Sequence, residues 1–345
     1  MLAALLVLIG GFAADAAPLG PDSLGVIFRS DDAASRDLAA FYARRRGIPR
    51  DNLVGISLPN TDGITPESLM SARAGVIARL PTQVQSLLLV WSRPYAVGCM
   101  SVTTAFAAGY RAAFCTPGCA GTAPNPLYDT DGWLPADTVG WWPAMLLPSD
   151  DQHLAHELVE RGIAADGTAP GGRVYLISTE DSPRNVRATE YVNAERRIGS
   201  RLEVARRATP LVGGIADAIG YFTGVQRVEE LSQITFLPGA AADHLTSSGG
   251  LLDGKDQMSV LAWLRQGATA SYGTVSEPCN RLEKFPNPGV LFEHYLRGDA
   301  LLEAYWKSIA MPGQGLFVGE PLARPFAARR RTAASVTDLQ HKVGI

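Results

Sequence analysis

The sequence has no excess of positive charge. Its 31 lysine and arginine residues face 34 aspartate and glutamate residues, which gives a formal net charge of −3 over 345 residues. Proteins that bind nucleic acid usually carry a basic surface, so we expect no nucleic-acid partner. The run Arg329-Arg330-Arg331 is interpreted as part of a solvated tail.

Long apolar segments are also scarce. The run from Leu2 to Ala14 is too short to span a bilayer, and no later segment is long and apolar enough, so no membrane span is expected in the mature chain. Ala14-Asp15-Ala16 has the small-x-small pattern of a cleavage site. We therefore predict a signal peptide over residues 1–16 and export to the periplasm or the cell exterior. No lysine or arginine precedes the run, and the alternatives are a start codon upstream or a buried amino-terminal strand.

Several signatures of catalysis and cofactor binding are missing. No G-x-S-x-G motif occurs, which weighs against a hydrolase of the α/β type. The glycines at 213, 214 and 220 precede a strand instead of linking a strand to a helix, so they form no phosphate cradle. No cofactor is expected. Asp129, Asp131 and Asp137 cluster oxygen ligands, but they lack the later ligands of an EF-hand loop, so calcium is only an alternative to an ordinary turn.

What the sequence does contain is a regular alternation of apolar strands and helices. With 46% apolar and 19% charged residues, its composition is that of a globular protein. Apolar strands are predicted over 23–29, 53–58 and 86–91, with helices beginning near Asp32 and at Thr65-Pro66 between them. This βαβαβ order predicts an α/β fold with a mainly parallel, doubly wound sheet of about six strands and helices on both faces.

The regular alternation of strands and helices is interrupted in one segment. Residues 93–148 contain many prolines and three of the four cysteines, with no clear periodicity. A segment of this length without periodicity is usually functional or an inserted subdomain. We therefore expect one domain over residues 17–326 with a long irregular insertion over 93–148, followed by a polar tail over 327–345.

A candidate site is predicted where two later strands end. The strands over 218–222 and 268–275 are separated by the loop 244–250 and a helix over 258–266, and ligands of parallel sheets bind beyond the strands' carboxyl ends. Ser247 or Cys279 is the candidate nucleophile, His244 the nearby base and Glu277 the group that orients it. An ordinary tight turn is the alternative for the loop. The candidate binding residues are Arg93, Thr223, Thr246 and Ser248.

The four cysteines are Cys99, Cys115, Cys119 and Cys279. In an exported protein an even number of cysteines indicates disulfides, whereas a zinc site at Cys115 and Cys119 would need two more ligands at suitable spacing. Because Cys99 and Cys279 each follow a predicted strand at the same edge, we predict that Cys99 pairs with Cys279 and that Cys115 pairs with Cys119.

Six short motifs are spread over nearly the whole mature chain. They are Gly47-Ile48-Pro49-x-x-Asn52, Pro238-Gly239-Ala240, Leu245-Thr246-Ser247, Gly267-Ala268-Thr269-Ala270, Gly273-Thr274-Val275-x-Glu277-Pro278 and Gly319-Glu320-Pro321-Leu322. Together they resemble an uncharacterised family of exported bacterial proteins of about this length. More distantly, the order of elements is similar to the catalytic domain of gingipain-type cysteine peptidases in the caspase-like clan, which implies a caspase-like sheet.

This chain departs from those peptidases at both catalytic positions. Thr223-Gly224 stands where the clan has His-Gly, and the position of the catalytic cysteine falls in the stretch 245–248, which has no thiol. We therefore expect a pseudo-peptidase with a non-catalytic binding or scaffold role toward an unidentified protein or peptide. A hydrolase, peptidase or esterase, with rearranged catalytic residues is the alternative.

Overall fold

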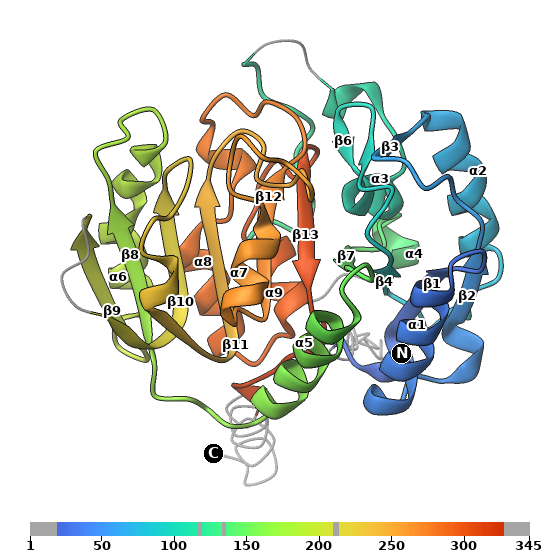
Figure 1. The fold of residues 1–345 in the computed structure, drawn as a ribbon, viewed down its shortest axis with the longest axis horizontal. Helices are drawn as coiled ribbons and strands as arrows, with labels where there is room; N and C mark the ends of the chain where they lie inside the picture. Colours follow the sequence, from blue (N-terminus) through green and yellow to red (C-terminus); the bar gives the residue numbers. More distant parts are fainter. Residues whose placement is uncertain (1–18, 116–118, 133–135, 210–213, 328–345) are drawn as a thin grey trace, which may run out of the picture.

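A sheet of ten strands with helices on both faces forms the fold (Figure 1). The structure is a computed structural model and describes residues 19–115, 119–132, 136–209 and 214–327. The predicted signal peptide (1–16), and the predicted tail (327–345) except for its first residue, lie outside the described residues. The strand order is β2-β1-β4-β7-β13-β12-β11-β10-β8-β9.

The predicted βαβαβ start is confirmed. The neighbours β2-β1-β4 are all parallel, and the two helices between them begin where the sequence indicated. Asp32 caps α1 by accepting the N–H of Ala34 at 3.0 Å, and Gly47 ends it with a φ of 68°. The bounds are β1 (Leu24–Arg29), α1 (Ala33–Arg46), β2 (Leu53–Ile56), α2 (Pro66–Ile77) and β4 (Ser86–Val90).

The sheet consists of two parallel blocks that run in opposite directions. The first block is β2-β1-β4-β7-β13 and the second is β12-β11-β10-β8-β9, and within each block all strands are parallel. β13 of the first block is antiparallel to β12 of the second. The blocks therefore meet between β12 and β13. The bounds are β7 (Ala144–Leu147), β8 (Arg173–Ser178), β9 (Glu203–Ala208), β10 (Ile215–Gly224), β11 (Ile234–Leu245), β12 (Ala270–Thr274) and β13 (Gly315–Gly319).

The predicted number of about six strands was too low. Two of the observed strands of the main sheet were not predicted: β11, which lies between the two strands assigned to the site, and β7, which closes the insertion. Pro238 and Gly239 stand inside β11, and these residues usually mark the end of a strand. Four apolar residues following Pro143 form β7, too few to show a period.

Helices cover both faces of the sheet, as predicted (Figure 1). Two neighbouring residues of β10 show the two layers: Tyr221 packs against Trp263 of α7, and Phe222 packs against Phe292 of α8. One face carries α1, α5 (Gln152–Ala165) and α7 (Val260–Gln266). The other carries α2, α3 (Val102–Ala108), α6 (Tyr191–Ile198), α8 (Pro288–Leu296) and α9 (Leu301–Lys307).

The segment 93–148 adds a small second sheet beside the main one. Its strand β5 (Ala96–Val97) is the central strand of this small sheet and pairs with β3 (Gly63–Ile64) on one side and with β6 (Met100–Ser101) on the other. The segment also holds α3 and the short helix α4 (Ala136–Val139). The N–H of Ser101 donates to the carbonyl of Gly313, just ahead of β13. The segment therefore packs against the middle of the main sheet.

Glu320, directly after β13, links the sheet to two helices. Its buried carboxylate accepts the Tyr42 hydroxyl at 2.7 Å and pairs with Arg46 of α1 at 2.6 Å. A Cβ at Gly162 would lie 2.3 Å from Oε2 of Glu320, so α5 can approach only because that position is glycine. This cluster fixes the end of β13 where the two blocks meet.

Candidate functional site

Most of the predicted site residues do gather at one edge of the sheet. Thr223 lies at the end of β10, and His244 near the end of β11. Thr246, Ser247 and Ser248 follow β11, while Glu277 and Cys279 follow β12. These three strands are parallel neighbours, so the residues share the carboxyl edge of the second block.

His244 is enclosed in the core. Its side chain is 1% exposed, and Trp263 Nε1 donates to its Nδ1 at 2.9 Å. Because an indole N–H can only donate, Nε2 carries the imidazole proton and donates to the carbonyl of Met258 at 2.9 Å. Burial lowers the pKa of His244 to about 3, so the ring is neutral. Both nitrogens are occupied, and His244 is not placed to act as a base for Ser247.

The loop after β11 is a tight turn held by side chains. Thr246 Oγ1 donates to Gln257 Oε1 at 2.7 Å and accepts from Arg184 Nε at 3.1 Å. The N–H of Ser248 donates to the same Gln257 oxygen at 2.8 Å. A Cβ at Gly250 would lie 2.5 Å from the carbonyl oxygen of Gly273, which explains the glycines of this loop by close packing on β12.

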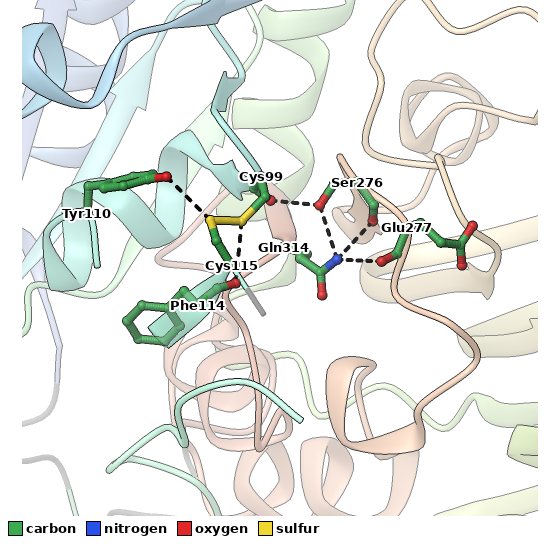
Figure 2. The surroundings of a disulfide bond; sticks show 7 residues. All are labelled: Cys99, Tyr110, Phe114, Cys115, Ser276, Glu277 and Gln314. Carbon is green, nitrogen blue, oxygen red and sulfur yellow. Dashed lines mark hydrogen bonds between the residues drawn. A yellow bond between two sulfur atoms is a disulfide. The ribbon is translucent and has the colours of Figure 1, made fainter. Parts of the chain in front are cut away.

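The predicted cysteine pairing was wrong. Cys99 pairs with Cys115 (Figure 2), and Cys119 pairs with Cys279. Cys99 lies in the turn between β5 and β6, not at the end of a main-sheet strand, and its Sγ is 3.5 Å from the carbonyl of Phe114. Moreover, β4 and β12 run in opposite directions, so their carboxyl ends do not share an edge.

Glu277 and Cys279 have structural partners in this segment. Oε1 of Glu277 accepts the N–H of Cys279 at 2.8 Å. Ser276 Oγ donates to the carbonyl of Cys99 at 2.7 Å, and Gln314 Nε2 donates to the carbonyl of Glu277 at 2.6 Å (Figure 2). The thiol of Cys279 is consumed by its disulfide, so the geometry offers no free nucleophile there.

Sequence reasoning missed a buried ion pair next to His244. Arg187, in the 3-10 helix Asn185–Glu190, pairs with Asp243 of β11, and both side chains are at most 1% exposed. The guanidinium also lies over the rings of Phe222 and Phe285 at 5.8 Å. Burial opposes its charge, but Asp243 raises the pKa of Arg187 and keeps it protonated. The sequence feature that could have indicated this pair is Asp243, a charged residue within the mostly apolar stretch 240–245.

Thr223 is buried on the opposite face of β10 from this pair. Its hydroxyl has no hydrogen-bond partner among the described residues. The side chain lines a cavity of about 250 Å³ together with Tyr221, Arg227 and Glu230.

Arg93 lies apart from the other predicted residues, beyond the carboxyl end of β4. Its side chain is 28% exposed and forms ion pairs with Asp62 at 2.8 Å, Asp150 at 3.2 Å and Asp253 at 2.8 Å. Tyr95 donates its hydroxyl to Asp253 at 3.0 Å. The hydrogen bonds that the guanidinium donates to Asp62 and Asp253 raise the pKa of Arg93, so its charge is permanent. Arg93, its three carboxylate partners and Tyr95 therefore hold one another in place.

A pocket of about 290 Å³ opens beside Arg93, between α5 and α7. Leucines from both helices form its walls, and charged groups gather at its rim. This combination of an apolar interior and a few convergent polar groups is typical of ligand pockets. Its lining residues are Ser92, Arg93, Pro148, Asp150, Asp151, Leu154, Ala155, Leu158, Leu252, Asp253, Leu261, Leu264 and Arg265.

The aspartates considered for calcium have cationic partners. Asp129 pairs with Arg197 at 2.5 Å and with Nε2 of His294 at 3.1 Å, and Asp131 pairs with Arg297 at 2.7 Å. The side chain of Asp137 lies outside the described residues. In the described part of the chain, no three His, Cys, Asp or Glu side chains are grouped as a metal site requires.

Comparisons of the chain with protein-family models, with curated proteins and with solved structures found no match. None of the helices within the described ranges has the length and apolarity needed to cross a membrane.

Proposed function

We propose that this is an exported protein with a non-catalytic binding or scaffold role, and that the pocket between α5 and α7 holds an apolar side chain of a peptide or protein ligand. The observation that carries the proposal is the pocket itself, whose leucine walls lie beside an arginine fixed by three carboxylates. The two disulfides support export, because disulfides persist in oxidising compartments.

The positions considered for catalysis support a non-catalytic role. His244 is neutral and hydrogen-bonded at both nitrogens, and Cys279 is in a disulfide. Nucleophilic catalysis needs a nucleophile within hydrogen-bond reach of an available base. The resemblance to gingipain-type domains belongs to the same proposal: a caspase-like sheet on which the catalytic dyad has been replaced by packing residues.

The rim of the pocket favours a basic ligand. Among its lining residues, Asp150, Asp151 and Asp253 outnumber Arg93 and Arg265. Asp62, which pairs with Arg93, adds a further negative charge. Complementary charge at a rim speeds association and selects between ligands. The preferred ligand is therefore an aliphatic side chain flanked by lysine or arginine.

Two synthetic peptides test this proposal: a leucine flanked by arginines, and the same peptide with glutamates in place of the arginines. We expect calorimetric titration to show binding of the basic peptide only. Leu261→Trp fills the pocket and should weaken binding about tenfold or more, since burying a leucine is worth about 1.5 to 3 kcal/mol. Leu282→Trp, outside the pocket, is the matched control and should leave the affinity unchanged.

Two results would overturn the proposal. One is equal affinity of the Leu261→Trp variant and the unmodified protein for the basic peptide, or no binding of that peptide at all. The other is peptide or ester hydrolysis by the purified protein that is lost on Ser247→Ala while the fold is retained, which would establish the hydrolase alternative.

A further inference from the structure

A second pocket, of about 540 Å³, lies on a different side of the molecule from the first. It is formed by the segment after β12, the 3-10 helix ahead of α6 and the chain after α9. None of its lining residues belongs to the pocket between α5 and α7. They are Tyr128, Glu190, Asn280, Arg281, Leu282, Glu283, Phe285, Asn287, Ser308 and Ala310.

The backbone around this second pocket is unusual. Four non-glycine residues of the described chain have a positive φ, and three of them lie in the two segments that border it: Asp129 (52°), Cys279 (59°) and Asn280 (55°). Such conformations cost free energy, persist only where the surroundings enforce them, and cluster at ligand-binding sites.

Covalent and ionic contacts enforce these conformations. Cys279 is fixed to Cys119 by the disulfide, directly ahead of Asn280. Asp129 is held by Arg197 at 2.5 Å, by His294 at 3.1 Å and by its own N–H, which donates to the carbonyl of Lys307 at 2.9 Å. The pocket and its neighbour Tyr128 are thus positioned before any ligand arrives, which lowers the entropic cost of binding.

The chemistry of the lining is polar with one accessible aromatic ring. Seven of the ten residues carry polar side chains, and they include both donors and acceptors. Glu190 accepts from Asn287 Nδ2 at 3.0 Å, and Arg281 Nε is buried without a partner among the described residues. The Tyr128 side chain is 37% exposed and stands at the pocket wall. An apolar ligand would leave these polar groups unsatisfied.

Charge narrows the ligand class further. Two carboxylates, Glu190 and Glu283, outweigh the single guanidinium of Arg281, so an anionic ligand is disfavoured. A ligand with many hydroxyl groups matches the donors and acceptors, and the partly positive C–H groups of a sugar ring are attracted to the negative face of an aromatic ring. We propose that this pocket binds a saccharide without acidic groups, stacked on Tyr128.

A glycan array carrying neutral hexose, amino-sugar and uronic-acid oligosaccharides tests the proposal on the full, oxidised chain. We expect binding to neutral or amino-sugar oligosaccharides and none to uronic acids. In calorimetric titration with the best oligosaccharide, Tyr128→Ala should weaken binding about fivefold to tenfold, and Tyr128→Phe should retain it because the ring remains. Leu261→Trp, in the other pocket, is the control and should not change the affinity.

Binding of no oligosaccharide on the array, or an affinity that is the same with and without the Tyr128 ring, would overturn the proposal. Preferential binding of uronic-acid oligosaccharides would overturn it as well. Because Leu261→Trp and Tyr128→Ala address separate pockets, a failure here is distinguishable from a failure of peptide binding between α5 and α7.

Discussion

Arg187 and Arg93 lie in the same fold in opposite surroundings. The Arg187 side chain is 1% exposed and has one carboxylate partner, whereas Arg93 is 28% exposed and has three. A buried charge depends on its partner because no water replaces it, whereas an exposed charge can change partners at little cost. The interior pair is therefore part of the fold, whereas a cationic ligand group can compete with Arg93 for one of its carboxylates.

We expect the largest loss of stability from a substitution that breaks the ion pair between Arg187 and Asp243. Asp243→Ala leaves Arg187 charged and unpaired, and should lower the free energy of unfolding by about 3 to 5 kcal/mol in denaturant titrations. The double variant Arg187→Met with Asp243→Leu removes both charges and should regain much of that loss. If the single variant lost less than about 1 kcal/mol, the interior pair would be no more essential than a surface pair.

The second largest loss of stability is expected when the disulfide between Cys119 of the insertion and Cys279 after β12 is removed. Replacing Cys119 and Cys279 by serine removes a bridge with a sequence separation of 160 and should cost about 2 to 4 kcal/mol. The same change at Cys99 and Cys115, with a separation of 16, is the control, and chain entropy predicts a loss about 2 kcal/mol smaller.

Non-reducing peptide mapping should recover both of these pairs. Equal losses in the two serine variants would mean that the long link does not constrain the unfolded chain as the entropy argument requires.

His244 is expected to make the free energy of unfolding depend on pH, by a smaller amount per pH unit than the losses above. Burial lowers its pKa to about 3 in the folded protein, below the value of about 6.5 expected when unfolded. Below pH 6.5 only the unfolded state takes up this proton, so stability falls by about 1.4 kcal/mol per pH unit on acidification. His244→Gln should show a shallower fall between pH 6.5 and 4.

The matched control for that titration is His153→Gln, because the His153 side chain is 82% exposed. It should reproduce the pH dependence of the unmodified protein. A His244→Gln variant with an unchanged slope would contradict the assignment of the acid sensitivity to the buried ring.

The smallest effect on stability is expected at the rim. Arg93→Gln should change the free energy of unfolding by no more than about 1 kcal/mol, because exposed ion pairs contribute little. The same variant should alter the selectivity between the arginine-flanked and glutamate-flanked peptides. A loss as large as that of Asp243→Ala would erase the difference between the two arginines.

The sequence was sufficient to predict the fold where each element carries its own signal. The main-sheet strands and the helices from Leu24 to Val90 have apolar periodicity, caps and a terminal glycine, and they were predicted in order, whereas the two-residue strand β3 was not. Nothing local predicts that β13 reverses direction relative to β12, because strand direction depends on partners distant in sequence. The number of strands was underestimated for the same reason, since Pro238 and Gly239 of β11 are tolerated only within the assembled sheet.

That the candidate residues lie at a common edge was predictable from the sequence, but the surroundings of each side chain were not. The polar residues after β10, β11 and β12 do share one edge of the sheet. Whether His244 is free or enclosed depends on Trp263, and the cysteine partners depend on the path of the insertion. Arg187 and Asp243 are 56 residues apart, and no spacing rule relates them.

The placement of β13 has a consequence for the order in which the chain folds. β13 is the last strand among the described residues, yet it occupies the middle of the sheet, between β7 and β12. Until residues 315–319 emerge, each block exposes an unpaired strand edge, and such edges recruit other chains. A chain truncated before Gly315 should therefore aggregate instead of forming two stable halves. The two blocks can be joined only after residues 315–319 have been synthesised, and pairing of strands that are distant in sequence is slow.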